Sequence, residues 1–195
     1  MGKVGAGFTM SLDGFIAKPD GDVGALFDWY SGGDVEVRYP GGMLVKVTPA
    51  SAAFIREVHF AAGAIVTGRR LFDITNGWEG QHPLDVPVFV VTHAPPPDWA
   101  HPDAPFTFVT DGVASAIAQA KTVAGDRAVG VGGANVAQQA LRAGLLDEVT
   151  IDLVPLLLGE GISFFGNLGG DRIALERTIE IAAPGVTHLR YRVVR

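Results

Sequence analysis

Short apolar segments with the character of buried strands recur along this chain, and helical segments lie between them. This alternation constrains the fold more than any other feature. Strand patterns cover residues 3–10, 64–67, 86–92, 106–109, 128–131 and 149–154. Helical patterns cover residues 48–63, 113–124 and 135–143; the first has Thr48 or Ser51 as its cap and Gly63 at its end, and Gly144 ends the last. Strands and helices that alternate at these lengths predict a largely parallel sheet covered by helices.

The C-terminal segment has a different period. Apolar residues occupy alternate positions in residues 173–181 and again in 189–193, and residues 183–185 (Ala-Pro-Gly) lie between them. This pattern predicts an antiparallel hairpin with one buried face, added to the end of the sheet. Because the 195 residues show no composition break, we expect one α/β domain over residues 1–195, with a central mixed, mostly parallel sheet.

Residues 18–49 are rich in Gly, Asp and Pro and show no sustained period. An excursion of this length inside a compact domain is unusual unless it serves as a lid or binding loop. We therefore predict a long functional loop with short ordered pieces, pinned to the body of the protein by Phe27 and Trp29.

Composition excludes several classes of function. The net charge is −6, from 15 basic and 21 acidic residues, so no basic field favours nucleic acid as a partner. The chain has no cysteine, and its five histidines form no HExxH or HxH pattern, so we predict no metal site. No apolar run approaches the ~20 residues of a membrane span, and the N-terminus lacks a secretory pattern. We therefore expect a cytoplasmic protein without membrane association.

The strongest local signal is VGVGGANVAQQALRAG at residues 129–144. Gly132 and Gly133 stand between an apolar strand and a helix that starts near Asn135. Glycines at such a corner let a ligand approach the backbone, and the helix N-terminus offers free N–H groups to a pyrophosphate. A tight turn without a ligand is the alternative, because Asn135 stands where the usual dinucleotide fingerprint has a third glycine.

A second candidate phosphate site is TGRRL at residues 67–71, directly after a predicted strand. Gly68 frees the backbone, and two adjacent guanidinium groups suit a phosphate, although the arginines could instead pair with carboxylates such as Asp73. Gly159-Glu160-Gly161 is a third, weaker turn. Asp13, at the close of the first strand, is the best placed lone carboxylate, but an Asp before Gly is also a common turn former.

Five segments in this order resemble the dihydrofolate reductase-like superfamily: SLDGFIA (11–17), TGRRLFD (67–73), PVFVVTH (87–93), GVGGANVAQQALRAGLLDEV (130–149) and LLLGEGISFF (156–165). The chain is most similar to the reductase domain of the bifunctional riboflavin-biosynthesis deaminase/reductase and to its stand-alone bacterial relatives. The resemblance spans nearly the whole chain. It implies a three-layer fold with helices on both faces of the sheet, NADPH as hydride donor, and a homodimer.

The resemblance also implies roles for residues. Thr9 and Ile16 would lie near the nicotinamide, and Thr92 and His93 beside the adenine ribose. The remaining cofactor contacts would come from the two glycine-containing turns and from the third, weaker one: Gly68, Arg69, Arg70, Leu71, Gly132, Gly133, Ala134, Asn135, Val136 and Gly161. If the protein is a reductase, we expect Asp13, Glu160 or an ordered water to deliver the proton.

One departure bears on the substrate. Folate reductases carry an acidic residue on the helix that precedes the TGRR-like strand, and Ala52 falls near that position. Loss of a charge-assisted contact costs about 1.5–3 kcal/mol, so a folate is disfavoured. We expect residues 18–49 to rebuild the pocket, with Phe27, Trp29 and Asp34 in its lining.

These observations favour an NADPH-dependent oxidoreductase that transfers a hydride to a small heterocyclic substrate, pyrimidine- or pterin-like, or to a carbonyl substrate. A nucleotide-binding module of the same fold without turnover is one alternative. An association role, in which the hairpin or another exposed strand mediates dimerisation and the glycine corners are only turns, is another.

Overall fold

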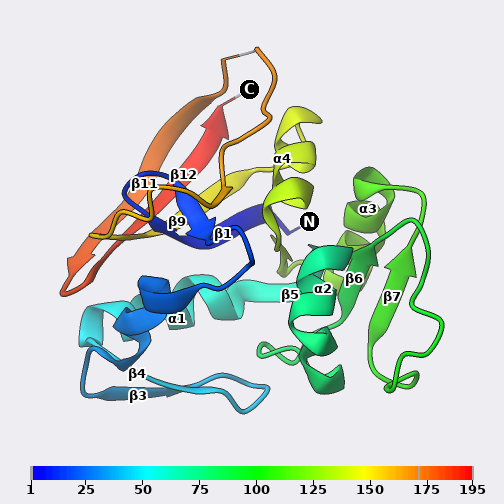
Figure 1. Cartoon of the computed structure of the whole chain (residues 1–195), viewed down its shortest axis with the longest axis horizontal. Helices are drawn as coiled ribbons and strands as arrows, with labels where there is room; N and C mark the ends of the chain where they lie inside the picture. Colours follow the sequence, from blue (N-terminus) through cyan, green and yellow to red (C-terminus); the bar gives the residue numbers. More distant parts are fainter. Residues whose placement is uncertain (1, 171, 195) are drawn as a thin grey trace.

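An eight-stranded sheet forms the centre of the computed structural model, which describes residues 2–170 and 172–194 (Figure 1). The strand order is β11-β12-β9-β1-β8-β5-β6-β7. The strands are β1 (Val4–Ser11), β5 (Ala62–Gly68), β6 (Val88–Val91), β7 (Phe106–Val109), β8 (Ala128–Val131), β9 (Glu148–Val154), β11 (Ala174–Ala183) and β12 (Val186–Val194). All pairs from β9 to β7 are parallel, whereas β12 pairs antiparallel with β9 and with β11. The predicted mixed, mostly parallel sheet with a C-terminal antiparallel hairpin is confirmed.

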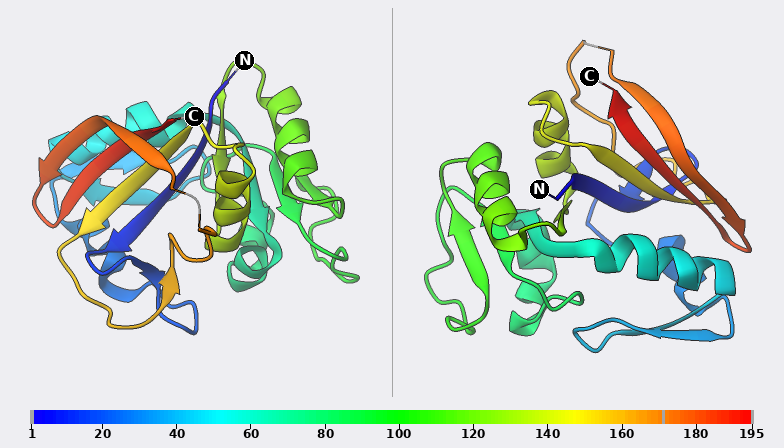
Figure 2. Two further views of the ribbon diagram at one scale, coloured as in Figure 1. Left: turned by 90° about the horizontal axis from the view of Figure 1, so that it is seen from above. Right: turned by 180° about the vertical axis from the view of Figure 1, so that it is seen from behind.

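Helices cover both faces of this sheet. On one face, α3 (Val113–Ala124) and α4 (Ala134–Arg142) pack their alanine-rich sides against alternate residues of the central strands, and this contact forms the largest core cluster. The other face carries α1 (Pro49–Val58) and α2 (Arg69–Ile74), each with its own smaller cluster. Figure 2 shows the helices on either side of the sheet. The three-layer arrangement follows from strands that are apolar on both faces.

Helix α1 begins where the sequence indicates. The Thr48 side chain accepts a hydrogen bond from the Ser51 backbone N–H, and Pro49 occupies the first turn. The prediction for its end is wrong: α1 stops at Val58, the 3₁₀ helix η2 (His59–Ala61) follows, and Gly63 lies inside β5. A Cβ at Gly63 would come within 2.7 Å of the Arg127 Cβ, so close packing of the strand explains this glycine.

Residues 18–49 contain more regular structure than a loop. They include the 3₁₀ helix η1 (Gly24–Ser31) and a small sheet of β3 (Val35–Arg38) with β4 (Leu44–Val47). Figure 1 shows this segment beside α1, away from α3 and α4. Trp29 is buried and anchors the segment to β12, as expected, through an edge contact with the His188 ring.

The hairpin has a two-residue turn, Pro184 and Gly185, and the structure corrects its predicted single buried face. Leu189, Tyr191 and Val193 pack against the main core, yet His188 on the opposite face is completely buried. The periodicity does not show this second covered face, because α1 and η1 supply the cover from distant parts of the sequence.

Three short elements complete the fold. β2 (Phe15–Ala17) pairs antiparallel with β10 (Ile162–Ser163), and the 3₁₀ turn η3 (Asn76–Gly80) follows α2. Asn76, Gly77, Trp78 and Glu79 all have φ between 48° and 56°. Four consecutive residues in the left-handed region are uncommon, and such strain persists only where the surroundings hold it in place.

Candidate functional site

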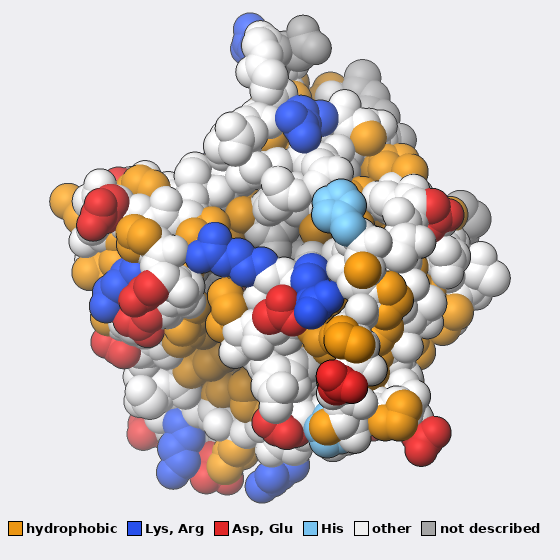
Figure 3. All heavy atoms as spheres, turned by 45° about the vertical axis from the view of Figure 1, so that its right-hand side comes forward, with side chains coloured by type: hydrophobic (Ala, Val, Ile, Leu, Met, Phe, Trp, Pro, Cys, Tyr) orange, Lys and Arg blue, Asp and Glu red, His pale blue; other side chains and the backbone are white. Residues whose placement is uncertain are grey.

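A large cleft of about 1300 Å³ opens on the α1/α2 side of the sheet. Figure 3 shows this side of the molecule hollowed, with basic side chains beside the hollow and hydrophobic side chains within it. Nearly all the residues that the sequence and the resemblance assign to a cofactor line this one cleft: Thr9, Ile16, Gly68, Arg69, Arg70, Leu71, Thr92, His93, Gly132, Gly133, Ala134, Asn135 and Val136.

The two glycine corners face each other in the cleft. Gly133 has φ +85° and forms the N-cap of α4 without any side-chain cap, so the helix begins with N–H groups that no side chain caps. A Cβ on Gly133 would lie 3.7 Å from the backbone nitrogen of Gly68. Side chains at these positions would fill the corner, and the glycines leave it open to a ligand.

Thr67 provides an independent observation at the same corner. Its hydroxyl oxygen is buried and has no hydrogen-bond partner, and it would lie 3.6 Å from a Cβ on Gly132. A buried hydroxyl without a partner is costly, and its usual explanation is a partner that binds there. The corner therefore fits an anionic ligand such as a pyrophosphate on two counts, the uncapped helix and the unpaired hydroxyl.

The arginines are partly occupied by the protein itself. Arg69 Nε donates to Asp73 Oδ1 at 2.7 Å and its Nη1 to the Ala94 carbonyl, so the expected alternative of pairing with Asp73 holds for this residue. Arg70 Nη2 donates only to a backbone carbonyl, that of Pro19, at 2.9 Å. Arg70 therefore has no carboxylate partner in the described part of the chain, and it keeps its charge for a ligand.

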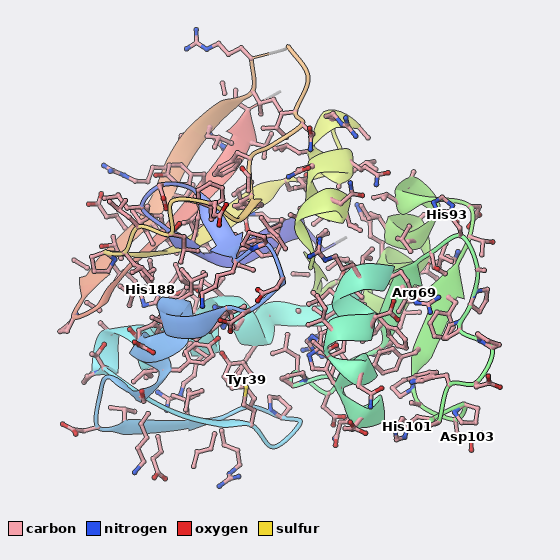
Figure 4. All side chains as sticks on the ribbon, in the orientation of Figure 1. Tyr39, Arg69, His93, His101, Asp103 and His188 are labelled. Atoms are coloured by element: carbon pink, nitrogen blue, oxygen red, sulfur yellow. The ribbon has the colours of Figure 1, made fainter. Side chains whose placement is uncertain are left out.

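On the same side, the Thr92 hydroxyl bonds with the backbone of Ala94, and His93 is exposed (Figure 4). Gly161 does not line the cleft. A Cβ there would lie 2.3 Å from the Ala17 carbonyl oxygen, so this glycine allows the close approach of the segment before β10 to β2.

Neither residue expected to deliver a proton lines the cleft. Asp13 is exposed and bonds with the Ser11 hydroxyl at 2.6 Å and the Gly159 N–H at 2.7 Å. The Ser11 hydrogen bond, reinforced by backbone N–H groups, holds the pKa of Asp13 below its usual value. Asp13 therefore holds two turns together, which is its expected alternative role. Glu160 is also exposed, in the turn that Asp13 binds.

A group of polar residues on the opposite wall did not emerge from the sequence. We call Tyr30, Tyr39, His59 and Asp152 the polar wall; all four line the cleft. Tyr39 OH lies 2.8 Å from His59 Nδ1 and 3.3 Å from Tyr30 OH, and His59 Nε2 lies 3.7 Å from Asp152 Oδ2. Figure 4 shows Tyr39 and His188 on the side of α1 and β3, whereas Arg69 and His93 lie across the molecule at α2 and β6.

Three groups of the polar wall have shifted pKa values. Burial raises the pKa of Asp152, but the hydrogen bond with His188 and the proximity of the His59 ring outweigh it and hold the pKa below its usual range. Burial raises the pKa of Tyr39 well above its usual value and that of Tyr30 to about 12. At neutral pH the wall thus presents one carboxylate beside neutral phenols.

The segment 18–49 contributes to the cleft with residues other than those expected. Phe27 lines the cleft as predicted, together with Tyr30, Tyr39 and Met43. The prediction is wrong for Trp29, which is buried against His188, and for Asp34, which is exposed away from the cleft.

Within residues 2–170 and 172–194, no group of three His, Asp or Glu side chains is placed to hold a metal ion. Over the same residues, no helix has the length and apolar character to span a bilayer.

The mixed sheet covered by helices gives this chain an α/β fold like that of dihydrofolate reductase. The family model described as RibD C-terminal domain matches residues 3–183, and the chain belongs to this family, which is a family of reductases. The resemblance seen in the sequence is thereby confirmed.

Several known proteins are similar to this chain. The chain is 26% identical over 161 residues to "Uncharacterized protein YwjB" of Bacillus subtilis (strain 168), covering 82% of this chain and 80% of that protein. It is similar to the crystal structure of a "Putative riboflavin biosynthesis protein" from Shewanella sp. PV-4, with a TM-score of 0.76, 21% identity and 99% of both chains covered. It is also similar to dihydrofolate reductase from Enterococcus faecalis complexed with NADP(H), with a TM-score of 0.60, 16% identity, and 98% and 96% of the two chains covered.

Proposed function

We propose that this protein is an NADPH-dependent reductase of a small heterocyclic or carbonyl substrate. The observation that carries the proposal is the meeting of two glycine corners in one cleft, next to a buried Thr67 hydroxyl without a partner. Membership in a reductase family and the shared fold of an enzyme complexed with NADP(H) support it.

Different residues along the cleft would bind different parts of NADPH. The N-terminus of α4 and the backbone at Gly68 would hold the pyrophosphate, with Thr67 as a hydrogen-bond donor. Arg70 would pair with a further phosphate at the adenosine end, which favours NADPH over NADH. Thr9 and Ile16, from β1 and β2, would bound the nicotinamide end, with the polar wall beyond them.

When bound, NADPH supplies a hydride from its nicotinamide ring. This chain would contribute position and exclusion of water, because the cleft floor is made of sheet residues and its walls are largely apolar.

Titration with NADPH and NADH, followed by quenching of tryptophan fluorescence, tests the proposal, because Trp78 lines the cleft. We expect saturable binding of NADPH that is tighter than that of NADH. Failure of both nucleotides to bind at millimolar concentration would remove the reductase proposal. Binding without oxidation of NADPH across pterins, pyrimidines, quinones and aldehydes would favour a nucleotide-binding module without turnover.

We also propose that the protein is a homodimer. The outer edge of β11 supports this, because residues 174–178 are all exposed and no strand pairs with this edge in the described part of the chain. Light scattering with and without NADPH measures the mass, and a monomer at micromolar concentration would argue against a dimer.

A further inference from the structure

The position of a proton on His188 determines the charge that the polar wall presents to the cleft. Thr48 Oγ1 accepts the Ser51 N–H and donates its own proton to Ser51 Oγ at 3.1 Å. The Ser51 hydroxyl proton is therefore free to go to His188 Nε2, 2.8 Å away. With Nε2 as an acceptor, Nδ1 carries the ring proton and donates it to Asp152 Oδ1 at 2.7 Å.

A neutral His188 leaves the charge of Asp152 in place. The imidazole is completely buried, stacked on Phe54 with 4.3 Å between ring centroids and in edge contact with Trp29. The neutral ring donates a hydrogen bond to one oxygen of the Asp152 carboxylate, and it does not neutralise the negative charge. His188 thus fixes the orientation of the Asp152 carboxylate, and the second carboxylate oxygen remains for another partner.

That second oxygen, Oδ2, belongs to a cleft-lining residue. It lies 3.7 Å from His59 Nε2, which is longer than a hydrogen bond, and the other His59 nitrogen already faces Tyr39 OH at 2.8 Å. The neighbouring phenols have raised pKa values and stay neutral. A nearly buried carboxylate with spare acceptor capacity selects a ligand that brings N–H donors.

Apolar side chains that line the same cleft define the rest of the ligand. Phe27 and Met43 come from the 18–49 segment, and Trp78 comes from the left-handed turn η3; all three line the cleft. Aromatic and thioether surfaces favour contact with a flat ring. Charge and shape together therefore specify a planar group with donors on one edge.

We propose that Asp152, held by His188 and Ser51, is the specificity-determining residue of the substrate end, and that it binds a planar ring carrying an amidine-like pair of N–H donors. This inference rests on the proposed reductase function and narrows its substrate class. It also revises the conclusion drawn from Ala52: α1 lacks a carboxylate, but β9 supplies one to the same cleft.

Three ligands of nearly the same shape test the inference, with NADPH present and absent. Benzamidine presents only donors, benzamide one donor group and one acceptor, and benzoate only acceptors. On the wild-type protein we expect benzamidine to bind at least roughly tenfold more tightly than benzamide, and benzoate to bind most weakly. Equal or tighter binding of benzoate would overturn the inference.

Asp152→Asn should remove the preference for benzamidine and leave NADPH affinity within about twofold, whereas Asp34→Asn, at an exposed position outside the cleft, should change neither. A benzamidine preference that survives in D152N would overturn the assignment. If D152N does not fold, proton NMR of the wild-type histidines decides. Benzamidine should shift the His59 ring resonances and leave those of His101, which lies outside the cleft, in place; the reverse would contradict the inference.

The NADPH titration separates the two proposals. If NADPH binds and the ligand order fails, the reductase proposal stands and the assignment of Asp152 falls. If NADPH fails to bind, the reductase proposal falls whatever the ligand order.

Discussion

The two ends of the cleft are built in different ways. The end at Gly68 and Gly133 is made mainly of backbone, with glycines at strand-to-helix corners and the uncapped start of α4. The end at Asp152 is made of side chains from η1, the turn after β3, η2, β9 and β12, segments that lie far apart in the sequence. A backbone site leaves a local signature in the sequence, and a site of converging side chains does not.

The largest expected effect is at the backbone end. Gly133→Val places a β-branched residue at φ +85° and fills the space between the corners, so NADPH affinity should fall roughly 100-fold, or about 2.8 kcal/mol. The fluorescence titration measures this. Gly42→Val is the matched control, because Gly42 has φ +98°, open space around it and no part in the cleft. Similar losses in both variants would show that strain alone acts and that the corner is no binding site.

At the side-chain end, Ser51→Ala should act on stability. The change removes the hydrogen bond to His188 Nε2 and leaves a completely buried ring nitrogen unpaired, which costs about 1–3 kcal/mol. Urea unfolding measures this loss, and NADPH affinity should stay unchanged. Ala53→Ser, on the exposed side of the same helix, serves as control. Loss of NADPH binding in S51A would mean that the two ends are not separable.

These two cases show what the sequence can predict. The mixed, mostly parallel sheet with its C-terminal hairpin was accessible from the period of the apolar residues. The α4 corner and the Gly68 turn were also accessible, because glycines between an apolar strand and a helix need no tertiary information. Asp152 lies inside an apolar strand, and His188 occupies one of the alternate positions of the hairpin at which the pattern predicts an exposed polar residue. Their contact at 2.7 Å depends on the pairing of β9 with β12, so local patterns could not find it.

For a related reason, the sequence left two roles open for Asp13. An Asp-Gly pair at the close of a strand is compatible with a site and with a turn, and only the distance to the Gly159 N–H distinguishes them. Residues 18–49 line the cleft with Phe27, as expected, but the other lining residues could not be assigned before η1 and β3 were placed.

Arg70→Ala should sharpen the comparison within the backbone end. Loss of a guanidinium group without a carboxylate partner should weaken NADPH binding roughly tenfold, or about 1.4 kcal/mol, with a smaller change for NADH. The ratio of the two dissociation constants is the readout. Arg56→Ala, exposed on α1 and outside the cleft, controls for overall charge. An unchanged ratio would remove Arg70 from the phosphate site.

Thr67→Val separates binding from stability at one position. Removal of a buried hydroxyl without a partner should stabilise the ligand-free protein by about 1 kcal/mol, while NADPH affinity falls severalfold. Thermal unfolding with and without NADPH gives both numbers. Thr75→Val is the contrasting variant, because its hydroxyl donates to the Leu71 carbonyl, and it should not stabilise. A T67V protein that binds NADPH as well as wild type would leave the orphaned hydroxyl unexplained.

The smallest effect belongs to Asp13. Its folded pKa lies below the ordinary 3.8, so its contribution to stability is present above pH 3.8 and disappears as the pH falls through the folded pKa. Asp13→Asn should therefore destabilise the protein slightly at pH 7, and the difference from wild type should shrink towards about pH 3. Urea midpoints at the two pH values, with D34N as control, test this; a difference that grows in acid would have the wrong sign.

Thr48 connects the start of a helix to the chemistry of the cleft. The Thr48 hydroxyl accepts the Ser51 N–H and so caps the N-terminus of α1. Through the Ser51 hydroxyl, it also determines which tautomer the His188 imidazole adopts on β12. The start of α1 and the charge of Asp152 therefore depend on the same threonine. A substitution at this surface-proximal threonine, chosen only for helix propensity, would also alter ligand selectivity.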